Sequence, residues 1–143
     1  MYDLIIIGSG PAGYVAAIRA GQSGLKTAIV EKDKIGGMCL NWGCIPTKSI
    51  LESAKTLHKV KQAAEFGIEG IDINNLSLNW KKASTRATKI VTKLTRGIEF
   101  LLKKNAVEII KAVSYTHLDV YKRQINMLFH VQYQNKPHLK IWL

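Results

Sequence analysis

The chain begins with a pattern of hydrophobic and polar residues that is typical of a β-α-β unit. The apolar run Leu4–Ile7 ends at a glycine, as does a strand buried on both faces of a parallel sheet. Small apolar residues from Val15 to about Ser23 predict a helix, and the run 27–30 predicts a second strand ending at Glu31. Strands joined by a helical crossover are parallel, so the predicted fold class is α/β.

Two long helices and a third strand are predicted next. Apolar residues at helical spacing indicate one helix from Ile45 to about Glu65 and another from about Leu78 to Lys104, with a polar turn over 72–75 between them. Alternation over 107–111 predicts the third strand. The apolar face predicted for the second helix consists of Ala83, Ala87, Ile90, Leu94 and Leu101. Residues 1–112 therefore fit a partial, truncated Rossmann-like domain.

The chain of 143 residues has a formal net charge of +11. Many of its cations recur at helical spacing on the second long helix, which favours a solvated face. A nucleic-acid surface is the alternative, but no base-reading motif accompanies the charge, and we expect no nucleic-acid partner. These cations are Lys81, Lys82, Arg86, Lys89, Lys93, Arg96, Lys103 and Lys104.

Hydropathy predicts no membrane segment. The apolar run near the start is far shorter than the roughly 20 residues that a spanning helix needs. Residues 1–3 lack the positive charge of a secretory signal, and the glycines from Gly8 onward would break its apolar region. We therefore expect a cytoplasmic protein without a membrane partner.

A glycine motif lies directly after the first strand and opens the first helix. Its backbone N–H groups and helix dipole would then face a pyrophosphate. Gly8 would permit the tight turn, Gly10 would let phosphates approach, and Gly13 would let helix and strand pack closely. Glu31 would accept both ribose hydroxyls of an adenosine and disfavour a 2′-phosphate. A glycine-rich turn that binds nothing is the alternative.

The two cysteines, Cys39 and Cys44, are five positions apart. On a regular helix their Cα atoms would be roughly 8 to 9 Å apart, beyond the limit of about 7 Å for a disulfide, so a working disulfide requires a distorted segment. Gly43 allows that distortion, and Pro46 suits the first turn of the next helix, where Cys44 would have a lowered thiol pKa. A zinc site with His58 and a pair of inert buried thiols are the alternatives; we expect no metal.

The cysteine segment resembles one known family. Residues 36–48 read Gly-Gly-Met-Cys-Leu-Asn-Trp-Gly-Cys-Ile-Pro-Thr-Lys, which is similar to the redox motif of the pyridine-nucleotide disulfide oxidoreductases, and within them of the dihydrolipoyl dehydrogenase branch. The resemblance covers Tyr2 to about Lys111. Glutathione and mercuric reductases share both cysteines but more often carry valine at the positions of Leu40 and Ile45, which makes them the alternative. A non-catalytic binding module on the same fold is an alternative of another class.

The resemblance implies FAD as cofactor and NAD as final electron acceptor. Cys39 would be the catalytic thiol that exchanges with the substrate, and Cys44 the catalytic thiol that faces the flavin. Met38 stands where the family usually has threonine. The implied cofactor-binding residues are Gly8, Ser9, Gly10, Pro11, Ala12, Gly13, Glu31, Lys32, Gly36, Gly37, Met38, Cys39, Cys44 and Lys48.

The implied substrate is dihydrolipoamide on a lipoyl domain of a 2-oxoacid dehydrogenase or glycine cleavage complex. The parent enzyme would be a homodimer whose catalytic histidine, paired with glutamate, comes from the partner subunit near the far C-terminus. The sequence contains no such His-Glu unit, no NAD domain and no interface domain, and it lacks the later Gly-Asp segment that closes the family's flavin site. We therefore expect this fragment to be inactive alone.

The segment 113–124 does not continue the pattern before it. Val-Ser-Tyr-Thr-His-Leu-Asp-Val-Tyr-Lys-Arg-Gln back-translates to a transposase mosaic end, used in sequencing libraries, joined head to head with its reverse complement. This predicts a native-like region over 1–112 and a non-native tail over 113–143. A divergent β-region from Tyr115 to Ile141 is the alternative.

Overall fold

The computed structural model describes residues 1–111 and 140–142, and the chain forms two compact units within it. The first unit comprises residues 1–37 and 97–143, and the second comprises residues 38–96. The predicted junction over 113–124 lies outside the described residues.

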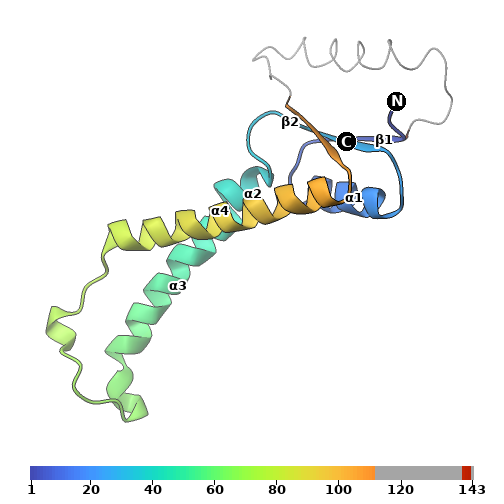
Figure 1. Ribbon diagram of the computed structural model, residues 1–143. Coiled ribbons are helices and arrows are strands. Elements are labelled where there is room, and N and C mark those ends of the chain that lie inside the picture. Colours follow the sequence, from blue (N-terminus) through green and yellow to red (C-terminus); the bar gives the residue numbers. More distant parts are fainter. Residues whose placement is uncertain (112–139, 143) are drawn as a thin grey trace. The chain divides into compact units, whose positions relative to one another are not determined.

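A parallel four-stranded sheet in the order β3-β2-β1-β4 forms the centre of the first unit (Figure 1). Its strands are β1 (Leu4–Ile7), β2 (Thr27–Glu31), β3 (Glu108–Lys111) and β4 (Lys140–Trp142). Leu4 pairs with Thr27 on one side and with Lys140 on the other. The predicted β-α-β unit and third strand are confirmed, and β4 adds a strand that the sequence pattern did not predict.

The core of the first unit lies against the sheet. Helix α1 (Pro11–Gln22) contacts β1 and β2 through buried small residues, and α4 (Trp80–Lys104) contributes its C-terminal turns. The strand β1 was predicted to be buried on both faces, but its residues alternate between buried and half-buried, whereas four of the five residues of β2 are buried. The buried apolar residues of this unit are Leu4, Ile6, Ala17, Ala20, Ala28, Ile29, Ile35, Ile98, Leu102 and Val107.

The second unit is helical. After α2 (Gly37–Asn41) come α3 (Cys44–Lys61), the 3-10 turns η1 (Ala63–Phe66) and η2 (Ile73–Asn75), and the first part of α4. Within this unit α3 and α4 diverge from a crossing point (Figure 1). At that crossing Arg86 donates hydrogen bonds to the carbonyl of Ser49 at 2.6 Å and to Oγ of Ser53 at 3.1 Å.

The structure corrects three details of the sequence prediction. The first long helix ends at Lys61, because the glycine-terminated segment 63–66 tightens into a 3-10 turn with Gly67 at φ +72°. The short helix α2 was not predicted, since its five residues carry no helical periodicity. On α4, Leu102 is fully buried while Leu94 and Leu101 are exposed, and the exposed Arg86 also donates a hydrogen bond to α3.

Candidate functional site

Two positions at the turn from β1 into α1 require glycine. Gly8 has φ +92° and donates its N–H to the carbonyl of Val30 at 2.7 Å, which ties the end of β1 to β2. A Cβ on Gly13 would lie 1.9 Å from the carbonyl oxygen of Gly8, so α1 can approach the strand only without a side chain there. A Cβ on Gly10 would meet no atom within 4 Å, which leaves that backbone open to an approaching group.

A buried carboxylate lies beside this loop. Oε2 of Glu31 accepts hydrogen bonds from the backbone N–H of Ser9 at 2.9 Å and from its hydroxyl at 2.5 Å, and Oε1 accepts from the N–H of Asp33 at 2.9 Å. Burial raises the pKa of Glu31, but these hydrogen bonds, with one from the N–H of Lys32, outweigh it and hold the pKa below its ordinary range. Glu31 is therefore ionised at neutral pH.

The turn before α2 closes over the same loop. The N–H of Gly36 donates to the carbonyl of Ser9 at 3.0 Å, and a Cβ on Gly37, which has φ +60°, would lie 2.8 Å from Cα of Gly10. Seven of the predicted site residues are thus brought together within the first unit. They are Gly8, Ser9, Gly10, Gly13, Glu31, Gly36 and Gly37.

This arrangement fits one end of a dinucleotide. No side chain caps the N-terminus of α1, whose first turn carries no acidic residue, and Pro11 and Ala12 there are exposed. Uncapped backbone N–H groups at a helix start suit a phosphate, and the open Cα of Gly10 gives it room. A carboxylate at the end of β2 suits hydroxyl donors. Lys32, by contrast, has an exposed side chain, and its backbone N–H donates a hydrogen bond to Glu31.

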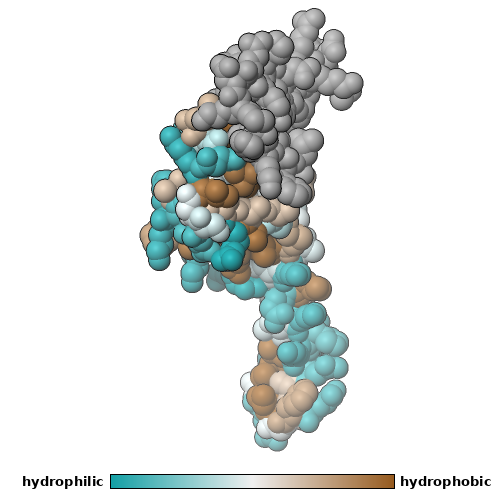
Figure 2. Space-filling model, turned by 90° about the vertical axis from the view of Figure 1, so that its right-hand side faces the viewer, coloured by the Kyte–Doolittle hydropathy of each residue, from teal (hydrophilic) through white to brown (hydrophobic). Residues whose placement is uncertain are grey.

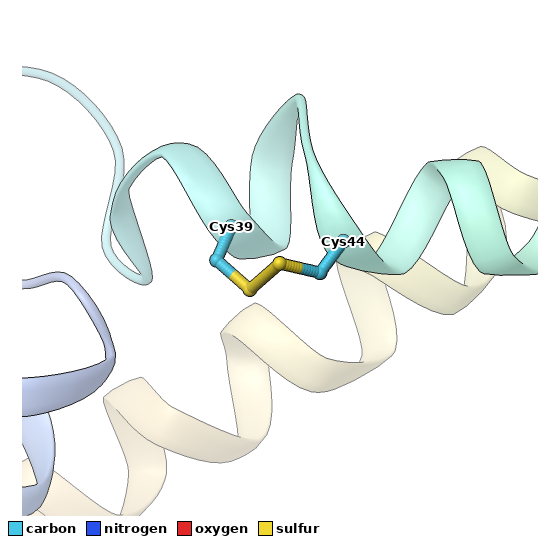
Figure 3. Close-up of a disulfide and its surroundings, with 2 residues drawn as sticks. All are labelled: Cys39 and Cys44. Atoms are coloured by element: carbon cyan, nitrogen blue, oxygen red, sulfur yellow. A yellow bond between two sulfur atoms is a disulfide. The ribbon is translucent and has the colours of Figure 1, made fainter.

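The two cysteines form a disulfide in the second unit (Figure 3). Cys39 belongs to α2 and Cys44 is the first residue of α3, with Cα atoms 4.8 Å apart. Gly43 separates the helices at φ −116° and ψ −108°, and a Cβ there would lie 3.1 Å from the carbonyl oxygen of Met38. The predicted distortion is confirmed: a helix break at glycine brings together two residues that a continuous helix would hold apart.

The side chains near the disulfide differ in exposure. Cys44 is exposed and Cys39 is half-buried. Lys48 follows Cys44 by four residues on α3, so the two share a helix face, and Lys48 is exposed. Met38 precedes Cys39 and is 71% exposed. Each of these positions offers a side chain that a bound molecule could cover.

Sequence reasoning missed two parts of the candidate site. It assigned Glu31 to a ligand and did not anticipate that Ser9 and Asp33 donate hydrogen bonds to the same carboxylate. The available signal was a serine placed between two glycines, opposite an acidic strand end. It also missed the buried Ser49, whose hydroxyl has no hydrogen-bond partner among the described residues.

Within residues 1–111 and 140–142, no three histidine, cysteine, aspartate or glutamate side chains are grouped as metal ligands. In the same part of the chain, no helix combines the length and apolar character needed to cross a bilayer.

Comparisons with known proteins agree with this geometry. A family model described as pyridine nucleotide-disulphide oxidoreductase matches residues 2–134. The chain is similar to a dihydrolipoyl dehydrogenase of Acholeplasma laidlawii, with 49% identity over 76% of this chain and 32% of the relative. It is also similar to enzymes of that name from Bacillus subtilis (strain 168), with 47% identity over 78% of this chain and 24% of the relative, and from Rhizobium etli, with 51% identity over 76% of this chain and 22% of the relative. The matched region therefore spans about a quarter to a third of these relatives.

Proposed function

The chain belongs to the pyridine nucleotide-disulphide oxidoreductase family, and on that premise we propose that it is the N-terminal, flavin-binding and redox-disulfide part of a dihydrolipoyl dehydrogenase. The parent enzyme would oxidise dihydrolipoamide through Cys39, Cys44 and FAD, with NAD as the final acceptor. The observation that carries this proposal is the disulfide across the α2–α3 break, which puts Cys44 at the start of an 18-residue helix.

The glycine loop is proposed to hold FAD. Gly8 to Gly13 would receive the pyrophosphate, with Ser9, Pro11 and Ala12 supplying backbone or surface at the start of α1. Glu31 would accept the ribose hydroxyls beside Lys32, and Gly36 and Gly37 would keep the second turn close to Gly10. Met38 and Lys48 would contact the cofactor near the thiols. When bound, FAD supplies an acceptor for an electron pair, which the family passes to NAD as hydride.

Cys39 is proposed as the thiol that exchanges with substrate. A dihydrolipoamide thiolate attacks its sulfur, the Cys39–Cys44 bond breaks, and Cys44 leaves as a thiolate. The second substrate thiol then attacks the mixed disulfide, which closes the lipoyl ring and releases Cys39. The substrate loses two electrons and two protons, and the protein disulfide becomes a dithiol. The helix start at Cys44 supports the leaving thiolate.

The exposure of the two sulfurs makes these roles testable. We expect iodoacetamide to label Cys44 at least as fast as Cys39 in the reduced chain without flavin, because Cys44 is the more exposed. Millimolar FAD should slow labelling of Cys44 and leave Cys39 nearly unchanged. Gly10→Val, which fills the open approach at that Cα, should remove the protection. Protection of Cys39 instead, or equal protection in the variant, would contradict the assigned roles.

The native-like region is proposed to end near Ala112, with a non-native tail beyond it. Residues 1–112 correspond to about a quarter to a third of the length of the curated relatives. Little or no lipoamide activity is expected, and flavin titration should show weak binding. Codons for Val113 to Gln124 that differ from the adapter sequence would rule out a chimeric junction, and tight stoichiometric flavin binding would show that this chain suffices to bind flavin.

That the parent enzyme acts on dihydrolipoamide is also part of our proposal. Leu40 and Ile45 favour the lipoyl enzymes over glutathione- or mercury-directed relatives, because those more often carry valine at both positions. The partners would be lipoyl domains of a 2-oxoacid dehydrogenase or glycine cleavage complex. Neither the glycine loop nor the disulfide favours a function of another class.

A further inference from the structure

A row of five cations runs along one face of α4 in the second unit. Their spacing alternates strictly between four and three residues, which places them in line over about 21 Å of helix. All five are exposed, and within residues 1–111 no carboxylate is paired with any of them. The row, called the basic stripe below, consists of Lys82, Arg86, Lys89, Lys93 and Arg96.

The basic stripe is unfavourable for the helix that carries it. Neighbouring members are three or four residues apart, so each adjacent pair places like charges side by side. The first turn of α4 also contains Lys81 and Lys82 and no acidic residue, although a helix start favours negative charge. Carboxylates laid along the stripe would offset this repulsion between like charges, so the stripe is complementary to an anionic occupant.

The N-terminal end of the stripe adjoins an apolar groove in the same unit. The groove has a volume of about 430 Å³ and lies between α3, the segment before α4 and the first turns of α4. Its apolar lining consists of Leu57, Val60, Leu76, Leu78 and Ala83, and Lys82 and Arg86 belong to both groove and stripe. Figure 2 shows hydrophobic and hydrophilic side chains next to each other on this helical part of the molecule.

We propose that the groove and the basic stripe together dock an acidic, amphipathic protein segment. Its apolar side chains would enter the groove, and its carboxylates would lie along the stripe at matching spacing. A protein segment is favoured over nucleic acid because no aromatic side chain is among the described residues that line the groove, whereas single-stranded nucleic acid binds by stacking on aromatic rings. One carboxylate, Glu52, lines the α3 wall and would select against acidic groups deep in the groove. The inference does not depend on the proposed redox function.

The test uses the whole 143-residue chain and a fluorescein-labelled helical peptide of about 18 residues, long enough to follow the stripe. The peptide carries glutamate at alternating three- and four-residue spacing and leucine on the adjoining face. Two control peptides replace either every glutamate by glutamine or every leucine by serine, and a single-stranded DNA of similar length is the competing polyanion. Binding is followed by fluorescence anisotropy.

The charge variants distinguish binding at the basic stripe from binding to positive charge anywhere on the chain. The double variant Lys89→Glu with Lys93→Glu should weaken binding of the acidic peptide about tenfold. Lys55→Glu with Lys59→Glu makes the same charge change on exposed positions of α3 outside the groove and the stripe, and it should weaken binding less than about twofold. Leu78→Ser, at a partly exposed groove position, should weaken only peptides that contain leucine. Circular dichroism of each variant establishes that α4 is intact.

The proposal is supported if both control peptides bind about tenfold more weakly than the acidic amphipathic peptide. It is overturned if the acidic peptide does not bind, or if the two charge variants weaken binding equally. It is also overturned if the serine peptide binds as well as the leucine peptide while DNA binds more tightly than either, because the surface would then be a general polyanion site.

Discussion

The glycine loop (Gly8–Gly13) and the disulfide segment (Cys39–Cys44) are held in shape by different kinds of contact. The loop in the first unit depends on contacts between residues far apart in sequence: Ser9 with Glu31, Gly36 with Ser9, and Gly37 with Gly10. The disulfide in the second unit depends on a helix break between residues five apart. The loop therefore requires its surrounding fold, whereas the disulfide geometry is encoded locally. The following predictions test that difference.

The largest effect is expected at Gly13. A methyl group there would lie 1.9 Å from the carbonyl oxygen of Gly8, so Gly13→Ala must displace α1 from the sheet. We expect a loss of about 3 kcal/mol or more in the free energy of unfolding, measured by urea denaturation. The matched control is Gly10→Ala, because Gly10 has φ −64° and open space around its Cα. Equal destabilisation by both would contradict the close packing assigned to Gly13.

Glu31 should give the next largest effect. In Glu31→Gln an amide nitrogen replaces one carboxylate oxygen and cannot accept the hydrogen bonds made to that oxygen. This loss should lower the free energy of unfolding by about 2 kcal/mol. The folded-state pKa of Glu31 lies below its ordinary value of 4.5. The carboxylate therefore contributes stability that is present above that ordinary value and is lost as pH falls through the folded-state pKa.

The pH dependence of unfolding separates this carboxylate from the other acidic groups. Urea midpoints of the natural chain should fall more steeply with acidification below pH about 4.5 than those of Glu31→Gln. If the urea midpoints of the two chains fall in parallel as the pH decreases, the hydrogen bonds from Ser9 and Asp33 do not lower the pKa of Glu31.

Reduction of the disulfide should have an effect of similar size on the free energy of unfolding, but a more local one on the structure. The closed loop is short, so the chain-entropy model gives a loss of about 2 kcal/mol. Because the sheet does not contain either cysteine, hydrogen exchange of β1 and β2 should change less than that of α2 and the first turn of α3. Cys39→Ser with Cys44→Ser is the permanent counterpart. Loss of protection throughout the sheet on reduction would show that the loop and the disulfide form one cooperative element.

The smallest effect is expected at Ala106, which has φ +55° in the turn between α4 and β3. Glycine adopts this left-handed conformation without a Cβ penalty, so Ala106→Gly should stabilise the chain by about 0.5 kcal/mol. Ala54→Gly, at an exposed position inside α3, should destabilise by about 1 kcal/mol. Thermal denaturation of the two variants gives opposite shifts in Tm if the left-handed strain at Ala106 is real.

Much of the first unit could be predicted because its pattern is regular. The apolar run before Gly8 and the second run ending at Glu31 predicted a parallel pair of strands, and the glycine spacing matched the turn that leads from β1 into α1. The partners of Glu31 could not be predicted, since they depend on how Ser9 and Asp33 meet in space. Leu102 was missed for a similar reason: one-residue differences in the buried face of α4 are decided by tertiary packing.

The second unit shows the opposite balance. The need for a distortion between Cys39 and Cys44 followed from helix dimensions alone, and Gly43 was correctly identified as the place for it. The contact of Arg86 with Ser49 was not foreseen, because a basic residue among other basic residues on a helix predicts solvent exposure. Side-chain contacts across a helix crossing require the crossing geometry, which periodicity does not supply.

The most direct test of the central claim, which includes the proposed junction near Ala112, is a dihydrolipoamide:NAD assay on the gene with the genomic sequence restored downstream of the Ala112 codon. The restored protein should be yellow and should reduce NAD with dihydrolipoamide, and both Cys39→Ser and Cys44→Ser should abolish that reaction while leaving flavin absorbance. A restored protein that lacks a nicotinamide domain, or that turns over glutathione or mercuric ion in place of dihydrolipoamide, would contradict the assignment.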